Sequence, residues 1–313
     1  MDWLFDNPLA DMHGTQFLFL YAVFAGIVVI AAVFFVDMQD MTGAMAPPPT
    51  PRDPDAYELA YLRGGANEVI RTAIYALRQK RLIEIVEKES RIKATGVAPG
   101  AFEITRLEQR VYEAILPAPL ISELFKGPNL RDDVESLCGA YRQSLAPQQL
   151  LTPPEVKRAA QYAWPIGIGL LVAAAGYKII AAILHGRSNL GFLFMETAAA
   201  CFILYWLVRK TTSGNASKRG KAWLSQIQLA YAGHVASAFG GGAVDRSAGG
   251  AALGASALFL VGLFGFGILK GTPDAALAQQ FAASQSGGDG GGGCGGGDGG
   301  GGGGCGGCGG GGD

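Results

Sequence analysis

Charged residues and histidine are scarce in this sequence. Only 16% of its 313 residues are charged and three are histidine, whereas about 25% of residues are charged in an ordinary soluble domain. The histidines, His13, His185 and His234, are far apart, and no Ser/His/Asp or Cys/His pair has the local pattern of a catalytic site. The net charge of −1 gives no overall field that would attract nucleic acid. We therefore predict a protein that is not a soluble enzyme and has no cofactor or histidine metal centre.

Neither Lys nor Arg occurs before Arg52, and residues 15–36 form an uncharged apolar run. As an α-helix this run is long enough to cross about 30 Å of hydrocarbon, so we predict a transmembrane helix after a short N-terminal segment, residues 1–14. A cleaved signal peptide is the alternative, because Ala44-Met45-Ala46 resembles a cleavage site. The first residues carry three Asp and no basic residue, and the apolar run is too long for a signal peptide, so a retained helix is favoured.

Residues 162–208 predict a transmembrane helical hairpin. Two apolar runs flank the short loop HGRSN, and Tyr and Trp stand at their far ends, as expected at a membrane interface. Lys178 and Glu196 interrupt these runs. Charges inside a membrane often mark an ion or proton pathway, but both residues lie within about two turns of the same loop. The favoured interpretation is that Lys178 extends towards the loop and that Glu196 pairs with it or with Arg187.

A fourth transmembrane helix is predicted over residues 251–269. These nineteen residues carry no charge, which is near the minimum length for a membrane span. A buried or interfacial helix is the alternative, because several Gly and Ser residues interrupt the run.

The distribution of cations predicts the orientation in the membrane. Sixteen of the 25 Lys and Arg residues lie in residues 52–160, and the positive-inside rule then places residues 37–161 in the cytoplasm. The basic, Gly-rich linker 209–250 is predicted on the same side, and the protein is expected in the bacterial inner (plasma) membrane as a multi-pass protein. The C-terminal tail is outside if residues 251–269 span the membrane and cytoplasmic if they do not.

Residues 55–161 predict a small cytoplasmic domain that follows a Pro-rich linker, residues 37–54. The spacing of apolar residues predicts helices over 55–63 and 66–81. The alternation of apolar and charged residues over 82–95 predicts a β-hairpin. The Pro-rich linker is expected to be stiff and to hold this domain away from the membrane.

A capping box of Thr105 and Glu108 predicts a third helix that ends at Leu116, and residues 131–145 predict a further amphipathic helix. The order helix, helix, hairpin, helix is the outline of a small winged-helix-like α+β module. Four basic residues on its second helix would suit DNA binding: Arg71, Arg78, Lys80 and Arg81. Residues 52–160 nevertheless carry sixteen basic and fifteen acidic residues, whereas a DNA-binding module normally presents a clearly basic face. We therefore favour an unidentified protein partner over nucleic acid.

The segment DPDAYELAYLRGGANEVIRTAIYALRQKRLIEI, residues 53–85, resembles a family of bacterial polytopic membrane proteins. These proteins share an ELAYLxGG motif, an internal pair of hydrophobic helices and a C-terminal tail rich in Gly and Cys. The resemblance extends to HGRSNLGFL at 185–193, to 211–224 and to GGGGCGGCGGGG at 301–312. Lys80-Arg81 departs from the Gly-containing turn common in the family. The family has no established activity, so the resemblance implies an architecture and no catalytic residues.

Residues 284–313 form a tail that is very rich in glycine. Residues 287–313 contain 21 Gly, three Cys, three Asp and nothing else, and we predict that they are disordered because no apolar side chain offsets the entropy lost by glycine. The candidate metal ligands are its thiols, which a spacer does not require: Cys294, Cys305 and Cys308. Three thiolates without histidine make an incomplete zinc site. An inert tail has two alternatives. The thiols could capture a soft ion such as Cu(I), aided by oxygens of Asp289 and Asp298, or an enzyme could modify the cysteines.

Together these patterns predict a mainly α-helical membrane protein with three or four transmembrane helices, a winged-helix-like domain and a disordered Gly/Cys tail. We expect a non-enzymatic scaffold or adaptor in the lipid bilayer that presents the thiol-bearing tail. Soft-metal capture or cysteine modification is the first alternative, and a membrane-tethered DNA-binding regulator is the second.

Overall fold

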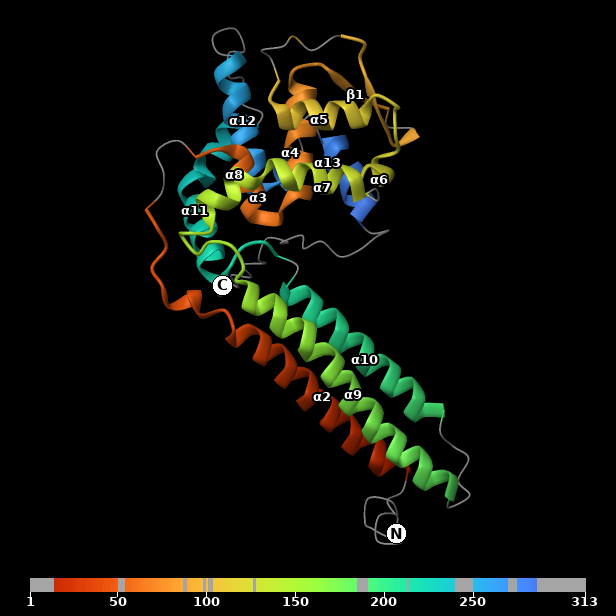
Figure 1. Cartoon of the computed structure of the whole chain (residues 1–313). Helices are drawn as coiled ribbons and strands as arrows, with labels where there is room; N and C mark the ends of the chain where they lie inside the picture. The colour runs from red at the N-terminus through yellow and green to blue at the C-terminus, as the bar shows by residue number, and fades with distance from the viewer. Residues whose placement is uncertain are drawn as a thin grey trace, which may run out of the picture.

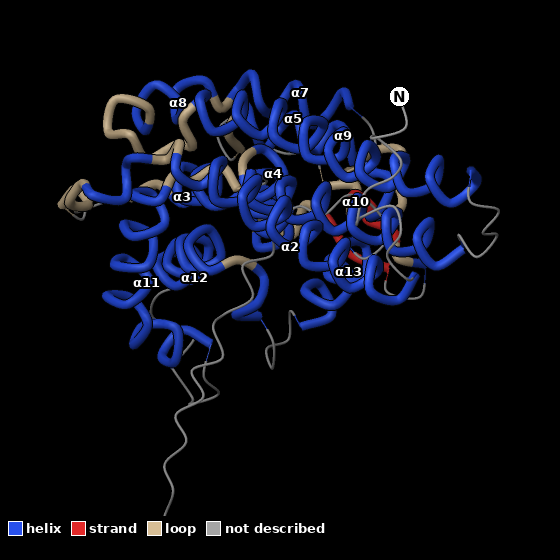
Figure 2. Tube along the Cα trace, turned by 90° about the horizontal axis from the view of Figure 1, so that it is seen from below, coloured by secondary structure: helices blue, strands red, loops and turns tan. Residues whose placement is uncertain are grey.

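A computed structural model shows a long three-helix bundle that carries a helical domain at one end (Figure 1). The structure describes residues 14–49, 54–86, 89–97, 100, 104–125, 128–184, 191–212, 214–239, 250–269 and 275–285. Helices make up most of the described elements, and the strands form one small pair (Figure 2).

The bundle consists of α2 (Gly14–Met38), α9 (Pro154–Leu184) and α10 (Gly191–Thr212). These are the described helices that are long and apolar enough to cross a membrane, which confirms the predicted runs over 15–36 and 162–208. Helix α9 begins eight residues earlier than predicted, because its polar first two turns continue the helix out of the apolar run. Residue 161, the predicted end of the preceding domain, therefore lies within α9.

Close packing holds the bundle together. Gly167 of α9 lies against Leu204 of α10, where an added Cβ would come within 2.6 Å of a leucine methyl group. The hydroxyl of Tyr21 in α2 donates a hydrogen bond to the carbonyl oxygen of Leu171, 3.2 Å away. Large apolar side chains such as Phe19 and Phe202 are exposed on the outside, as expected for helices that face lipid.

Lys178 lies inside the bundle, and the loop towards which it is predicted to extend lies outside the described residues. Its side chain is buried, and its ammonium nitrogen lies 4.8 Å from the centre of the Phe17 ring in α2. Glu196 is half-buried on α10, and Arg187 lies outside the described residues. In this interior position the ring of Phe17 stabilises the ammonium group by a cation–π contact, near the end of the bundle that is farther from the domain.

The first part of the domain follows the predicted order of elements. Helices α3 (Ala56–Gly64) and α4 (Ala66–Gln79) precede the hairpin of β1 (Ile83–Val86) and β2 (Arg91–Ala94), and α5 (Arg106–Ile115) follows. The strands are antiparallel, with Ile85 opposite Ile92. The apolar stripe of α4 is buried, as its three- and four-residue spacing predicts.

The predicted capping box is confirmed at the start of α5. The Thr105 hydroxyl accepts a hydrogen bond from the backbone N–H of Glu108 at 3.2 Å, and the Glu108 carboxylate accepts one from the Thr105 N–H at 2.6 Å. The helix predicted over 131–145 is divided at Cys138 into α7 (Pro128–Leu137) and α8 (Gly139–Leu145). The division occurs at Gly139, a weak helix former. The short helix α6 (Ile121–Leu124) precedes α7.

The predicted linker over residues 209–250 is wrong. It contains the 22-residue helix α11 (Lys218–Phe239), whose Trp223, Leu224 and Ile227 are buried in the same core as α3 and α4. The basic start and the Gly-rich sequence after α11 obscured this apolar face, which repeats at one- and three-residue spacing.

The predicted fourth membrane span over 251–269 is also wrong. Helix α12 (Gly250–Phe264) has 15 residues, about 22 Å in length, which is too short for a 30 Å hydrocarbon layer. It ends at Gly265, whose φ of 83° reverses the chain into the 3₁₀ turn η4 (Phe266–Leu269). Its Val261 and Leu263 are fully buried in the domain core, and it lies beside α11 (Figure 2). In the part of α12 whose side chains are described, Leu260, Val261 and Leu263 are therefore covered by protein.

The last described helix, α13 (Ala275–Gln285), packs on α6 and η4. The domain is thus discontinuous in sequence: residues before the α9–α10 hairpin and residues after it share one core. Only with α11, α12 and α13 in place is that core covered.

The linker over 37–54 is partly fixed to the domain. The 3₁₀ turn η2 (Met41–Ala44) lies at the start of α11, where the Asp40 carboxylate accepts a hydrogen bond from the backbone N–H of Lys218 at 2.7 Å. The Thr42 hydroxyl accepts one from the N–H of Arg219 at 3.2 Å. The first half of the predicted spacer is therefore a cap on a domain helix.

A second connection joins the chain that enters α9 to the chain that leaves α10. The N–H of Ser217 donates to the carbonyl oxygen of Leu150 at 2.9 Å, and the N–H of Thr152 donates to that of Asn215 at 2.8 Å. The bundle and the domain are thus joined by hydrogen bonds at two places.

Candidate functional site: the base of the cysteine-bearing tail

The predicted metal ligands Cys294, Cys305 and Cys308 lie outside the described residues. The last described residue before them is Gln285, at the end of α13. What the structure defines is therefore the base of the tail, the surface of the domain on which α13 lies.

Helix α13 is held by aromatic packing. Its Leu277 and Phe281 are buried, and the Phe281 ring makes edge-to-face contacts with Phe266 of η4 at 5.0 Å and with Phe125 after α6 at 5.8 Å. Aromatic pairs in this geometry contribute about 0.5–1.5 kcal/mol beyond the area that they bury. The residues that follow α13 therefore start from a fixed place on the domain. Sequence reasoning missed this helix, although Leu277 and Phe281 have the four-residue spacing of a buried helical face.

The ELAYLxGG segment, residues 58–65, links α3 to this C-terminal part of the domain. The Arg63 guanidinium donates hydrogen bonds to the carbonyl oxygens of Val261 at 3.1 Å and Gly262 at 2.8 Å, in the last turn of α12. Carbonyls in a last turn have no partner within their own helix, so Arg63 supplies one and also places positive charge at the negative end of the helix dipole.

Glu68 joins Arg63 to a second cation. Its carboxylate accepts hydrogen bonds from Arg63 and from Arg71, and the Arg71 guanidinium lies 5.3 Å from the centre of the Phe125 ring. Burial alone would raise the pKa of Glu68, but the two guanidinium groups outweigh it and hold this pKa below its usual value. The ionic network therefore ties α12 to α4 and to the aromatic cluster under α13.

Gly65, the last residue of the motif, has a φ of 70°, a backbone conformation that favours glycine. An added Cβ there would lie 3.3 Å from the side-chain nitrogen of Asn215, which donates a hydrogen bond to the carbonyl oxygen of Tyr61 at 3.1 Å. The motif thus also binds the chain that leaves α10. In the described part of the domain its contacts are those of a structural junction.

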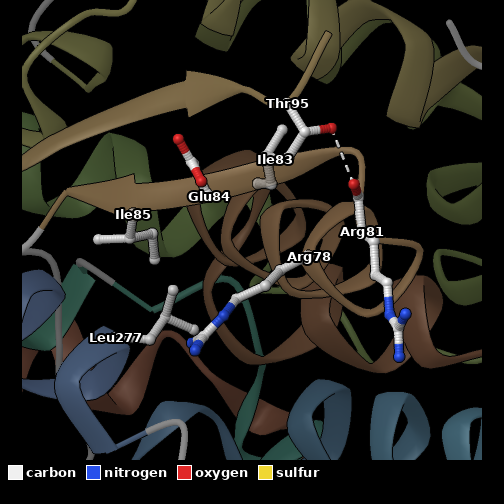
Figure 3. A pocket seen from close by; sticks show the side chains of 7 residues that line it. All are labelled: Arg78, Arg81, Ile83, Glu84, Ile85, Thr95 and Leu277. Atoms are coloured by element: carbon white, nitrogen blue, oxygen red, sulfur yellow. Dashed lines mark hydrogen bonds between the residues drawn. The ribbon is translucent and has the colours of Figure 1, made fainter. Parts of the chain in front are cut away.

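A pocket of about 290 Å³ lies between the end of α4, the hairpin and α13 (Figure 3). Its floor is apolar and is formed by Ile83, Ile85 and Leu277. The guanidinium of Arg78 lies beside Leu277, whereas that of Arg81 points away from it, and the Thr95 hydroxyl donates to the Arg81 carbonyl oxygen at 2.9 Å. An apolar floor with polar groups at its edge suits a peptide side chain better than a reaction centre.

Two of the four basic residues that predicted a DNA-binding face, Arg71 and Lys80, are paired with acidic side chains. Arg71 binds Glu68, and the Lys80 ammonium lies 2.9 Å from the carboxylate of Glu108. Burial alone would raise the pKa of Glu108, but hydrogen bonds from the backbone of Thr105, from Lys80 and from a tyrosine hydroxyl keep it below its usual value. Arg71 and Lys80 therefore help to stabilise the domain, whereas Arg78 and Arg81 line the pocket.

Among the described residues, no group of three or more His, Cys, Asp or Glu side chains could hold a metal ion. Cys138 is fully buried, and burial together with the nearby Glu135 raises the pKa of its thiol to about 12. Cys201 is half-buried in the bundle, so both described cysteines lie in packed surroundings.

Comparisons of the chain with protein-family models, with curated proteins and with solved structures gave no match. The resemblance to the membrane-protein family stays a prediction, and function is argued from the geometry alone.

Proposed function

We propose that the protein is a non-enzymatic membrane scaffold that presents its thiol-bearing tail from a fixed point on the domain. The observation that carries this proposal is the position of α12, which packs on α3 and α4 and is too short to cross a membrane. Helix α13 then packs on the same domain. The tail therefore starts on the membrane side that holds the domain.

That side is the cytoplasm, and the membrane is the bacterial inner membrane. Support comes from the sixteen basic residues in 52–160 and from the absence of Lys and Arg before Arg52. Cytoplasmic thiols are kept reduced, so Cys294, Cys305 and Cys308 act as free thiols. Reduced thiols suit binding of a soft ion such as Cu(I) or modification by an enzyme better than a structural disulfide.

The domain serves as an interaction module for a protein partner. Its order of helices and hairpin supports a winged-helix-like description, and the pairing of Lys80 with Glu108 and of Arg71 with Glu68 weakens the case for DNA binding. A DNA-binding regulator would instead require salt-dependent binding of duplex DNA by the full chain.

The test is thiol labelling of Cys308 in cells that express a Cys294→Ser, Cys305→Ser variant. A membrane-impermeant maleimide is applied to intact spheroplasts and then to permeabilised ones. We expect Cys308 to react only after permeabilisation. The matched control carries Ser188→Cys with all three tail cysteines changed to Ser, and this residue of the α9–α10 loop should react in intact spheroplasts. Labelling of Cys308 in intact spheroplasts would overturn the proposal.

The role of the thiols is tested separately by intact mass and copper content of the purified full chain. A bound ion should disappear, or a mass increase should be lost, when the three tail cysteines are changed to Ser. A protein that has neither metal nor added mass under any growth condition supports a tail without either role.

A further inference from the structure

The domain-side ends of α9 and α10 carry a continuous aromatic surface. The rings of Trp164 in α9 and Tyr205 in α10 meet edge-to-face at 5.7 Å, which joins the two helices into one patch. Tyr162 and Trp206 lie at the same ends of these helices, and all four side chains are exposed. Tyr and Trp in such a position lie at the level of lipid head groups.

Two cations on α10 lie directly over these rings. The Arg209 guanidinium lies 5.8 Å from the centre of the Tyr205 ring, and it donates a hydrogen bond to the hydroxyl of the same tyrosine at 2.6 Å. The ammonium of Lys210 lies 5.1 Å from the centre of the Trp206 ring. Each cation is one helical turn, about 6 Å, further towards the domain than its ring. These two cation–π contacts hold both charged groups against the helix surface.

Helix α9 adds two cations at the same end. Lys157 and Arg158 are exposed, and Arg158 precedes Tyr162 by one helical turn. Of the acidic residues on this end of the bundle, Glu155 lies in the first turn of α9 and is exposed, whereas Asp37 of α2 is paired with Lys218 at 2.7 Å. Beside the aromatic patch, four basic residues therefore stand against two exposed carboxylates, one of which, that of Asp37, is paired with Lys218.

We propose that this surface, formed by Trp164, Tyr205, Trp206, Arg209 and Lys210, binds an anionic phospholipid from the leaflet on the domain side. The two cations of α10 contact the head-group phosphate, and Lys157 and Arg158 add to the local positive potential. The acyl chains lie against the exposed apolar side chains of the same helices, such as Ile166 and Phe202. The charge complementarity and the depth of the aromatic rings favour a lipid over a soluble anion. The inference is independent of the role of the tail.

The test uses tryptophan fluorescence of the full chain with Trp3→Phe, reconstituted in phosphatidylcholine vesicles. Trp164 and Trp206 report on the surface, whereas Trp223 is buried in the domain. Lipids with brominated acyl chains quench nearby tryptophan, and brominated phosphatidylglycerol is compared with brominated phosphatidylcholine at equal mole fraction. We expect the anionic lipid to bind at least about fivefold more tightly, since one basic residue near the surface contributes about 1 kcal/mol.

Variants then assign the preference to these residues. Arg209→Gln with Lys210→Gln should remove it, and Arg209→Lys with Lys210→Arg, which keeps the charge, should retain most of it. The matched control, Arg91→Gln with Lys93→Gln, removes the same charge from the hairpin and should change nothing. If the first double variant does not fold, Lys157→Gln with Arg158→Gln replaces it and should weaken the preference. Equal quenching by both lipids, or a preference that survives the loss of the cations, would overturn the proposal.

Discussion

Substitution of Gly262 by Ala should loosen the contact between α12 and α3. An added Cβ at this position would lie 2.3 Å from the carbonyl oxygen of Ala56 and 3.0 Å from its Cα. Both are backbone atoms, so the clash can be relieved only by a shift of a whole helix. Overpacking of this kind costs about 1–3 kcal/mol, and the shift also lengthens the hydrogen bond from Arg63 to the Gly262 carbonyl.

A contact of 2.3 Å with a backbone oxygen places the cost of overpacking in the upper part of that range, about 2–3 kcal/mol. Ala favours the helix over Gly by about 1 kcal/mol, which offsets part of this cost. We therefore expect a net loss of about 1–2 kcal/mol in the free energy of unfolding of the domain, which corresponds to a factor of about 5–30 in the opening equilibrium. Gly139→Ala is the control, because it makes the same chemical change in α8, where no atom lies within 4 Å of the added Cβ. It should leave the domain unchanged or slightly more stable.

The assay follows alkylation of Cys138 in a chain whose three tail cysteines are changed to Ser. This thiol is fully buried and its pKa is raised to about 12, so at pH 8 it reacts only when the domain opens. Gly262→Ala should increase the alkylation rate about 5–30-fold, and Gly139→Ala should not increase it. If Cys138 of the Gly262→Ala protein reacts no faster than that of the parent, the packing of α12 on α3 is refuted. The prediction of a fourth membrane span over 251–269 would then be favoured again.

Three further predictions concern stability and chemistry. Because the pKa values of Glu68 and Glu108 are lowered in the folded state, their contribution to stability is complete above the unfolded-state pKa of about 4.3 and is lost as the pH falls through the folded-state values. Denaturant unfolding between pH 3 and 7 should show this loss of stability. The Glu68→Gln variant should be less stable at pH 7, and its stability should depend less steeply on pH. Asp40→Ala removes the cap on α11 and should cost about 1 kcal/mol, measured by thermal unfolding, whereas Asp37→Ala removes an ion pair at the surface and should cost less. At pH 8 a small maleimide should modify the tail cysteines of the native chain and leave Cys138 unmodified, and peptide mass mapping that found Cys138 modified first would contradict its burial.

Local signals were sufficient to predict the first part of the domain. Helices α3 and α4, the hairpin and the capping box at Thr105 depend on residues that are near one another in sequence. The membrane-spanning runs were predicted equally well, because length and apolar composition decide whether a helix can cross a bilayer.

The second part was not predictable, because its apolar residues are covered by partners distant in sequence. Val261 packs in a core with Ile70 and Leu77, and hydropathy measures how apolar a run is without indicating what covers it. Gly262 interrupts the apolar run in the sequence, and in the fold it permits the close approach of α12 to Ala56. The base of the tail on α13 could have been found from Leu277 and Phe281, but two apolar residues are a weak signal by themselves.

The discontinuity of the domain has a consequence for its biosynthesis. When a ribosome has completed α3, α4 and the hairpin, helices α11, α12 and α13, which contribute to the same core, have not yet been translated. The α9–α10 hairpin is made next, so the nascent chain must enter the bilayer while the core of its domain is still incomplete. Maturation of the domain therefore waits for membrane insertion, and a chain truncated before residue 250 would leave the ribosome with apolar surface that chaperones or proteases recognise.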